Sequence, residues 1–139
     1  MKKAFVADAS VAIAWCTPGQ SSDVADRLLD DIVAGSIVFV PALWHYEVAN
    51  ALLVLWRRKK LAQDDDSQAR MWLDRLPVAV DSDSPRLAVT QITDFAMAHE
   101  LTVYDAAYVE LAVRRQIPLA SRDQSLKRAA HRLGIPLLL

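Results

Sequence analysis

The sequence has a single cysteine, Cys16, among its 139 residues. No disulfide can form within the chain, which suits a reducing compartment. No apolar run approaches the roughly 18 residues that a membrane-spanning helix needs. The apolar start of the chain is interrupted by Asp8 and Ser10, unlike a secretory signal peptide. These absences favour a soluble cytoplasmic protein.

An excess of charge of either sign is also lacking. The sixteen basic and seventeen acidic residues leave a net charge of -1, so any contact with nucleic acid must use a local basic patch. The three histidines, His45, His99 and His131, lack the spacing of a helical zinc pair. A hydrophobic content of 53% and a length of 139 residues fit one globular domain with a substantial core.

The pattern of apolar segments and helix signals predicts strands that alternate with helices. Short apolar segments predict strands at 3–7, 36–40, 78–80, 118–120 and 135–139. Helical spacing and capping residues predict helices at about 9–16, 21–34, 43–60, 64–76, 86–99, 102–115 and 123–133. This order predicts an α/β fold in which helices cover both faces of a mostly parallel sheet, as one domain over residues 1–139.

A few acids lie where ligand sites form in such sheets, outside the carboxyl ends of the strands. Asp8 ends the first strand, Asp123 follows the fourth, and Asp105 opens a helix. Each of these three could also cap a helix. Glu47 lies in the middle of the predicted helix 43–60, where capping does not account for it. It is either a site carboxylate or a partly buried acid paired with a base such as Arg58.

Other acids have simpler explanations. Glu110 lies about 140° around the helix from Asp105 and is predicted to be a solvated surface acid. Asp81 and Asp83 are typical of a polar turn. The acidic run 64–66 places favourable charge at a helix N-terminus.

If the four singled-out acids converge, their carboxylates repel one another and resist ionisation unless a positive charge lies among them. Because no suitable His or Cys cluster is present, the natural counter-charge is Mg²⁺ or Mn²⁺, which prefers oxygen ligands and retains water. Such a metal can activate water and neutralise charge on a phosphodiester. Ser10 and Ser121 could hydrogen-bond these carboxylates or a metal-bound water.

Three segments, VADASVAIAW, VPALWHYEVANALL and LTVYDAAYVELAVRRQIPLASRDQSLKRAA, resemble PIN-domain ribonucleases, and among them the VapC-type toxins of bacterial toxin–antitoxin pairs. The resemblance covers essentially the whole chain and keeps the motif order. It implies a three-layer α/β/α sandwich and an endoribonuclease that depends on Mg²⁺ or Mn²⁺. It also implies a small VapB-like antitoxin that covers the site, and frequently a homodimer of the toxin.

The resemblance also assigns roles to single residues. The family's acidic cluster and its supporting polar residues fall on Asp8, Glu47, Asp105, Asp123, Ser10, Asn50 and Ser121. Of these, Asp8 and Asp105 match the best-supported metal ligands. Arg122 stands where many relatives carry a smaller or apolar residue, and it could contact substrate phosphate or pair with the acids.

Basic and aromatic residues suggest two kinds of binding surface. The run 57–60 is explained by a helix C-terminus, although Arg58 could contact the RNA backbone near Glu47. A further basic rim could comprise Arg114, Arg115, Arg122, Lys127, Arg128 and Arg132. Aromatic residues on several faces of one helix indicate that at least one meets another chain, and these are Trp44, Tyr46 and Trp56.

Two functions from other classes compete with the ribonuclease. One is a non-catalytic module that binds RNA or a protein partner, although the presence of all four acids gives no sign of a dead site. The other is a phosphoryl-accepting receiver or a phosphatase-like domain. A phosphatase would favour a DxD motif, whereas the sequence has Asp8, Ala9 and Ser10.

Overall fold

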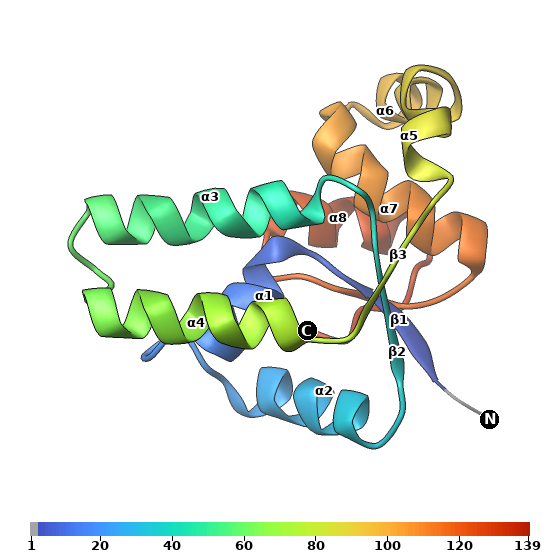
Figure 1. The fold of residues 1–139 in the computed structure, drawn as a ribbon. Coiled ribbons are helices and arrows are strands. Elements are labelled where there is room, and N and C mark those ends of the chain that lie inside the picture. Colours follow the sequence, from blue (N-terminus) through green and yellow to red (C-terminus); the bar gives the residue numbers. More distant parts are fainter. Residues whose placement is uncertain (1–2) are drawn as a thin grey trace.

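The computed structural model describes residues 3–139, and its elements follow the predicted alternation (Figure 1). The strands are β1 (Ala4–Ala7), β2 (Ile37–Val40), β3 (Val78–Val80) and β4 (Leu119–Ala120). The helices are α1 (Ala9–Cys16), α2 (Asp23–Val33), α3 (Trp44–Arg57), α4 (Gln63–Arg75), α5 (Ser84–Leu87), α6 (Thr93–His99), α7 (Val103–Arg115) and α8 (Gln124–Arg132), with a π-helical turn η1 (Ala88–Ile92) between α5 and α6.

The sheet is parallel throughout, and its strand order is β3-β2-β1-β4. The chain moves from β1 through β2 to β3 in one direction and then returns past β1 to β4. Right-handed crossovers therefore place α1 to α4 on one face and α5 to α7 on the other. Accordingly α1 contacts α2, α3 and α4, whereas α7 contacts α6 and α8 (Figure 1). The predicted three-layer α/β/α sandwich is confirmed, and its strand order reverses between β1 and β4.

Helix α7 is the most deeply enclosed helix of the sandwich. Every residue from 106 to 112 is buried, because α7 packs against β1, β4, α6 and α8. The main core gathers around the sheet, and a smaller cluster of Leu87, Ile92 and Ala96 packs on the N-terminal half of α7. The first turn of α7 is more open, since Val103 and Tyr104 are exposed and Asp105 is partly buried, but it continues directly into this buried segment.

Most element boundaries agree with the sequence prediction to within about two residues, and three elements differ more. The helix predicted over 43–60 ends at Arg57, since Lys59 adopts a left-handed backbone conformation with φ of 56°. The helix predicted over 86–99 is interrupted by the π-helical turn, where the Thr93 hydroxyl donates to the Ala88 carbonyl at 2.6 Å. The strand predicted at 135–139 is reduced to one bridge between Leu119 and Leu137.

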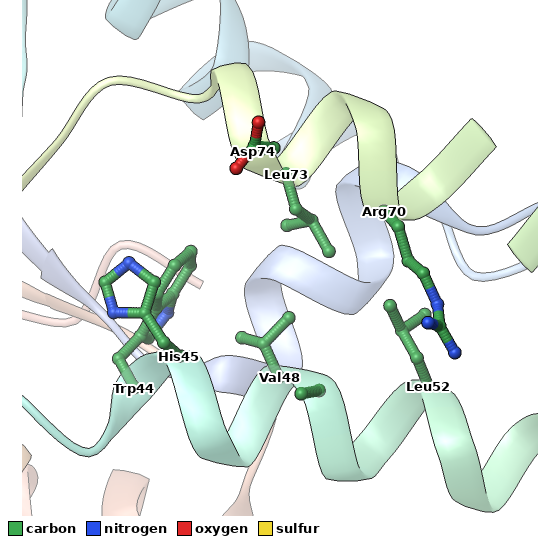
Figure 2. Close-up of a pocket in the computed structure, with 8 residues that line it drawn as sticks. Trp44, His45, Val48, Leu52, Arg70, Leu73 and Asp74 are labelled. Atoms are coloured by element: carbon green, nitrogen blue, oxygen red, sulfur yellow. The ribbon is translucent and has the colours of Figure 1, made fainter. Parts of the chain in front are cut away.

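Helices α3 and α4 form an antiparallel hairpin that projects from the sheet (Figure 1). A cleft of about 270 Å³ opens between them, with Leu73 of α4 pointing toward Val48 of α3 (Figure 2). His45, Arg70 and Asp74 supply polar groups to its lining. None of the described helices combines the length and hydropathy that a membrane span requires.

Candidate active site

Asp8 lies at the point where the strand order reverses, the place where parallel sheets bind ligands. The register pairs Ala7 with Ala120, so Asp8 and Ser121 leave the sheet side by side. The Ser121 hydroxyl donates to Asp8 Oδ2 at 2.5 Å, and the Ser10 hydroxyl donates to Oδ1 at 2.5 Å. Asp8 also caps α1 and is only 4% exposed. It is therefore both a helix cap and a buried carboxylate of the candidate site.

Asp123 enters the site from the start of α8. Its Oδ1 caps that helix by accepting the backbone N–H groups of Ser125 at 2.8 Å and Leu126 at 3.1 Å. The hydroxyl of Ser121 also accepts the Asp123 N–H at 3.0 Å. One serine therefore connects the carboxylate at the end of β1 to the loop after β4.

The prediction that Glu47 lies in the middle of its helix is wrong, because α3 begins at Trp44 and Glu47 lies in its first turn, partly buried. The hydroxyl of Tyr108, which is 2% exposed on α7, donates to Glu47 Oε1 at 2.5 Å. The alternative of an ion pair with Arg58 is wrong, because Arg58 is exposed beyond the other end of α3. Tyr108 therefore joins two helices from opposite faces of the sheet at the site.

Asp105 does not cap α7. Thr102 occupies that position, and its hydroxyl oxygen accepts the Asp105 N–H at 3.1 Å. The carboxylate of Asp105 stands in the first turn of the helix and is partly buried. The N-cap of α7 is therefore Thr102, and the Asp105 carboxylate lies one turn into the helix.

The site acids repel one another. Burial raises the pKa values of Asp8, Glu47 and Asp105, and hydrogen bonds to each of the three oppose this effect. The charges of Asp123 and Asp8 raise the pKa of Asp105 further, and neighbouring acids do the same for Glu47. None of the ion pairs within residues 3–139 involves these acids. The described part of the fold thus leaves their negative charge without a basic partner.

The metal prediction stays a prediction. Within residues 3–139, no group of three or more His, Cys, Asp or Glu side chains is arranged so that it could hold a metal ion by itself. The acids are close enough to raise one another's pKa values, but three of them do not form a preassembled ligand set. Any cation would need water or substrate oxygens to complete its coordination.

Arg122 does not pair with the acids. Its guanidinium donates to Gln20, to the backbone carbonyl at 3.2 Å and to Oε1 at 3.4 Å, and its backbone N–H donates to the Ser10 hydroxyl at 2.8 Å. Asn50 is exposed and lines a separate groove with Tyr46, Leu53 and Arg70. No hydrogen bond within the described chain joins Asn50 to the acids. Its supporting role stays a prediction.

A second group of acids lies farther along α7 and differs from what the sequence predicts. Asp81 is fully buried, and Glu110 is 2% exposed. Arg114 binds Asp81 with both terminal nitrogens, at 2.6 and 3.2 Å, and binds Glu110 through Nε at 2.7 Å. Arg115 approaches Asp81 at 3.6 Å. The predictions of a solvated Glu110, of Asp81 as mere turn chemistry and of a basic rim containing Arg114 and Arg115 are wrong.

One part of this second group could have been found in the sequence. Glu110 and Arg114 are four residues apart on a helix, the spacing of an ion pair. Burial alone would raise the pKa of Asp81, but the hydrogen bonds and charge of Arg114 outweigh burial and lower it. The partners of Asp81 are distant in the sequence, and no local pattern indicates them.

Comparisons with known proteins agree on one family. The model of the PIN domain matches residues 5–132. The chain is 32% identical over 137 residues to Ribonuclease VapC1 of Mycobacterium tuberculosis, an alignment that covers 98% of this chain and 95% of that protein.

Two solved structures have similar folds. The structure of PAE2754 from Pyrobaculum aerophilum has a TM-score of 0.71 and 23% identity, and the match covers 99% of this chain and 91% of that one. The structure of VapBC2 from Rickettsia felis, bound to a DNA fragment from its promoter, has a TM-score of 0.62 and 12% identity, with 96% of both chains covered. At these identities the structures support the fold alone.

Proposed function

The chain belongs to the PIN domain family, and we propose that it is an endoribonuclease that acts as the toxin of a VapC-type toxin–antitoxin pair. One observation carries this proposal: the charge of the site acids at the strand-order reversal is not neutralised by any base of the described fold. Uncompensated carboxylates of this kind are suited to cation-assisted chemistry on a phosphodiester. The name of the relative Ribonuclease VapC1 supports the choice of RNA as substrate.

The cofactor we propose is Mg²⁺ or Mn²⁺. Asp8 and Asp105 would hold it, with Glu47 and Asp123 contributing directly or through water. The donor set fits, because these cations bind through one or two carboxylates, several waters and substrate phosphate, and need no cage of three protein ligands. When bound, such a cation activates water and neutralises charge on the phosphodiester during displacement.

Three hydroxyl groups of the chain hold the site carboxylates in fixed orientations. Ser10 and Ser121 each hold one oxygen of Asp8, so that its carboxylate plane cannot rotate freely. Tyr108 holds Oε1 of Glu47 and leaves Oε2 outside that bond. Groups that orient site carboxylates in this way support both cation affinity and catalysis.

Cleavage of RNA in the presence and absence of metal tests the proposal. The purified chain is incubated with a fluorescent single-stranded RNA in Mg²⁺, in Mn²⁺ and in EDTA. We expect the wild-type chain to cleave with either metal and not in EDTA. The Asp105→Asn variant should not cleave under any of these conditions. Asp94→Asn is the matched control, since Asp94 also lies in the first turn of a helix but is exposed. Cleavage that survives EDTA, or that is unchanged in Asp105→Asn, contradicts the proposal.

A non-catalytic module that binds RNA or a partner is the second candidate, and the lack of a preassembled three-ligand group among residues 3–139 is the observation that favours it. Calorimetric titration with Mg²⁺ and Mn²⁺ separates the two candidates. No heat of binding at millimolar metal, together with no cleavage, would favour the module over the enzyme.

We also propose an antitoxin partner and a homodimer. The name VapBC2, which the Rickettsia felis structure carries, supports a partner of this kind. On α3 of the present chain, Trp44 is buried in the core, whereas Tyr46 and Trp56 are 82% and 47% exposed and are available for another chain. Light scattering measures the oligomeric state. Co-expression with a short upstream reading frame tests whether an antitoxin binds and inhibits cleavage.

A further inference from the structure

A groove of about 520 Å³ runs from the candidate active site along α3. Its lining comprises Ser10, Ile13, Gln20, Ala51, Val54, Leu55, Arg122 and Asp123. The two residues Ser10 and Asp123 belong to the acidic site, so the groove begins where the carboxylates lie. The remaining lining combines aliphatic side chains with the guanidinium of Arg122 and the carboxamide of Gln20.

Helix geometry makes this groove continuous with the site. Ala51, Val54 and Leu55 follow Glu47 on α3 at intervals of four, seven and eight residues, so all lie on the face of the helix that carries the site carboxylate. They are partly buried and supply an aliphatic wall. A strand of nucleic acid whose phosphodiester lies at the acids would have its next nucleotide along this wall.

Among the described residues that line this groove, Arg122 alone has a cationic side chain. Its guanidinium is positioned by two oxygens of Gln20, both of which are neutral. No ion pair within residues 3–139 includes Arg122, in contrast to Arg114, whose charge is matched by buried acids. The positive charge of Arg122 is therefore held in place without being neutralised, as a phosphate-binding group requires.

We propose that this groove binds one unpaired nucleotide adjacent to the cleaved bond, with Arg122 on its phosphate and its sugar and base against Ala51, Val54 and Leu55. The proposal rests on the ribonuclease function and deepens it. The aliphatic wall offers no hydrogen-bonding group that would read a base edge, and the carboxamide oxygen of Gln20 is bound to Arg122. Only an unpaired nucleotide can lay its base against the wall, so this subsite favours single strands without selecting a base.

The test is steady-state cleavage of a defined single-stranded RNA by Arg122→Gln. We expect KM to rise roughly tenfold with little change in kcat, because a contact to a flanking phosphate is made equally in the ground and transition states. The dependence of log KM on log salt concentration should also become shallower by about 0.7, the value for one lost phosphate contact on a single strand. A purely structural role would not change this slope.

Two further variants locate the effect in the groove. Ala51→Leu fills the aliphatic wall and should raise KM without altering the salt slope. Arg27→Gln is the matched control, because Arg27 is exposed and donates to a neutral carbonyl as Arg122 does. Its Nε donates to the backbone carbonyl of Asp23 at 3.3 Å, and it lies on α2, outside the groove. It should leave both KM and the salt slope unchanged. Circular dichroism confirms that each variant is folded.

The outcomes separate this inference from the proposed function. A wild-type chain that cleaves RNA, together with an unchanged KM in Arg122→Gln and Ala51→Leu, overturns the nucleotide subsite and leaves the ribonuclease intact. If these variants instead weaken only the binding of a co-expressed antitoxin, the groove accepts a peptide and the nucleotide assignment is overturned. A wild-type chain that cleaves no RNA in Mg²⁺ or Mn²⁺ contradicts the ribonuclease itself.

Discussion

Two groups of acids lie against α7, and they differ in what neutralises or binds their carboxylates: one group is paired with an arginine, and the other is hydrogen-bonded to neutral hydroxyls. In the C-terminal half of the helix, Asp81 and Glu110 are buried with Arg114 between them. In the N-terminal half, the partners of the site acids include the neutral hydroxyls of Ser10, Ser121, Thr102 and Tyr108. Burial of a carboxylate therefore does not by itself mark a functional site. Within residues 3–139, the two groups differ in that only the group of Asp81 and Glu110 has a basic partner for its charge.

The two groups also differ in what they contribute to stability. Removing one partner of a buried ion pair leaves an uncompensated charge and costs about 3–5 kcal/mol. Removing one of several mutually repelling acids relieves repulsion. We therefore expect that substitutions of Asp81 or Glu110 reduce stability, whereas substitutions of the site acids reduce activity.

Asp105→Asn should give the largest effect. If Asp105 holds the proposed cation, its loss removes several kcal/mol of transition-state stabilisation, and cleavage should fall about a thousandfold. The free energy of unfolding measured in EDTA should stay the same or rise, because one repelling charge is gone. Single-turnover cleavage and urea denaturation measure the two quantities. A large loss of stability would place Asp105 in the structural group instead.

Asp81→Asn should show the reverse pattern. The charge of Arg114 would lose its closest partner, and the free energy of unfolding should fall by about 3 kcal/mol, which lowers Tm by about 10 °C. Cleavage per folded molecule, measured well below the transition, should persist. Asp83→Asn is the control, since Asp83 forms only an exposed ion pair with Arg86, and its loss should cost less than about 1 kcal/mol. Equal losses in both variants would contradict the comparison.

Tyr108→Phe tests the hydroxyls that support the acidic group. The ring still fills its buried place, but Glu47 loses a hydrogen bond, so affinity for the activating metal should fall about tenfold and stability by about 1 kcal/mol. The Mg²⁺ dependence of cleavage measures the first effect. Tyr104→Phe, on a side chain that is 65% exposed, should change neither quantity. An unchanged Mg²⁺ dependence in Tyr108→Phe would remove Tyr108 from the site.

The pH dependence of stability should give the smallest effect, with opposite signs in the two groups. Burial and repulsion raise the pKa values of Asp8, Glu47 and Asp105. Their contribution to the free energy of unfolding is therefore fully present below the usual carboxyl pKa and is lost as pH rises through the raised values. Because the pKa of Asp81 is lowered, its contribution is present above the usual value and is lost as pH falls through the lowered value.

Denaturation in EDTA across a pH series measures these contributions. Asp105→Asn should reduce the loss of stability on the alkaline side of the usual carboxyl range, and Asp81→Asn should reduce the loss on its acidic side. The same change in both variants would show that the two groups titrate alike.

Local patterns in the sequence predicted most of the fold but only part of the site. Strand ends, helix starts and the capping roles of Asp8 and Asp123 were predictable, since each depends on a few adjacent residues. The Tyr108 partner of Glu47 lies 61 residues away, and the Arg114 partner of Asp81 lies 33 residues away. Such contacts depend on how α7 packs across the sheet, and no local periodicity encodes this packing.

The three faces of α3 limit how its sequence can change in evolution. One face carries Glu47 and the aliphatic wall, another carries Tyr46 and Asn50, and a third meets α4 through Val48. Inserting or deleting one residue early in the helix would rotate everything beyond it by about 100° and exchange these surfaces. Homologues are thus expected to vary in length at the loop between α3 and α4, while the spacing from residue 47 to residue 55 stays fixed.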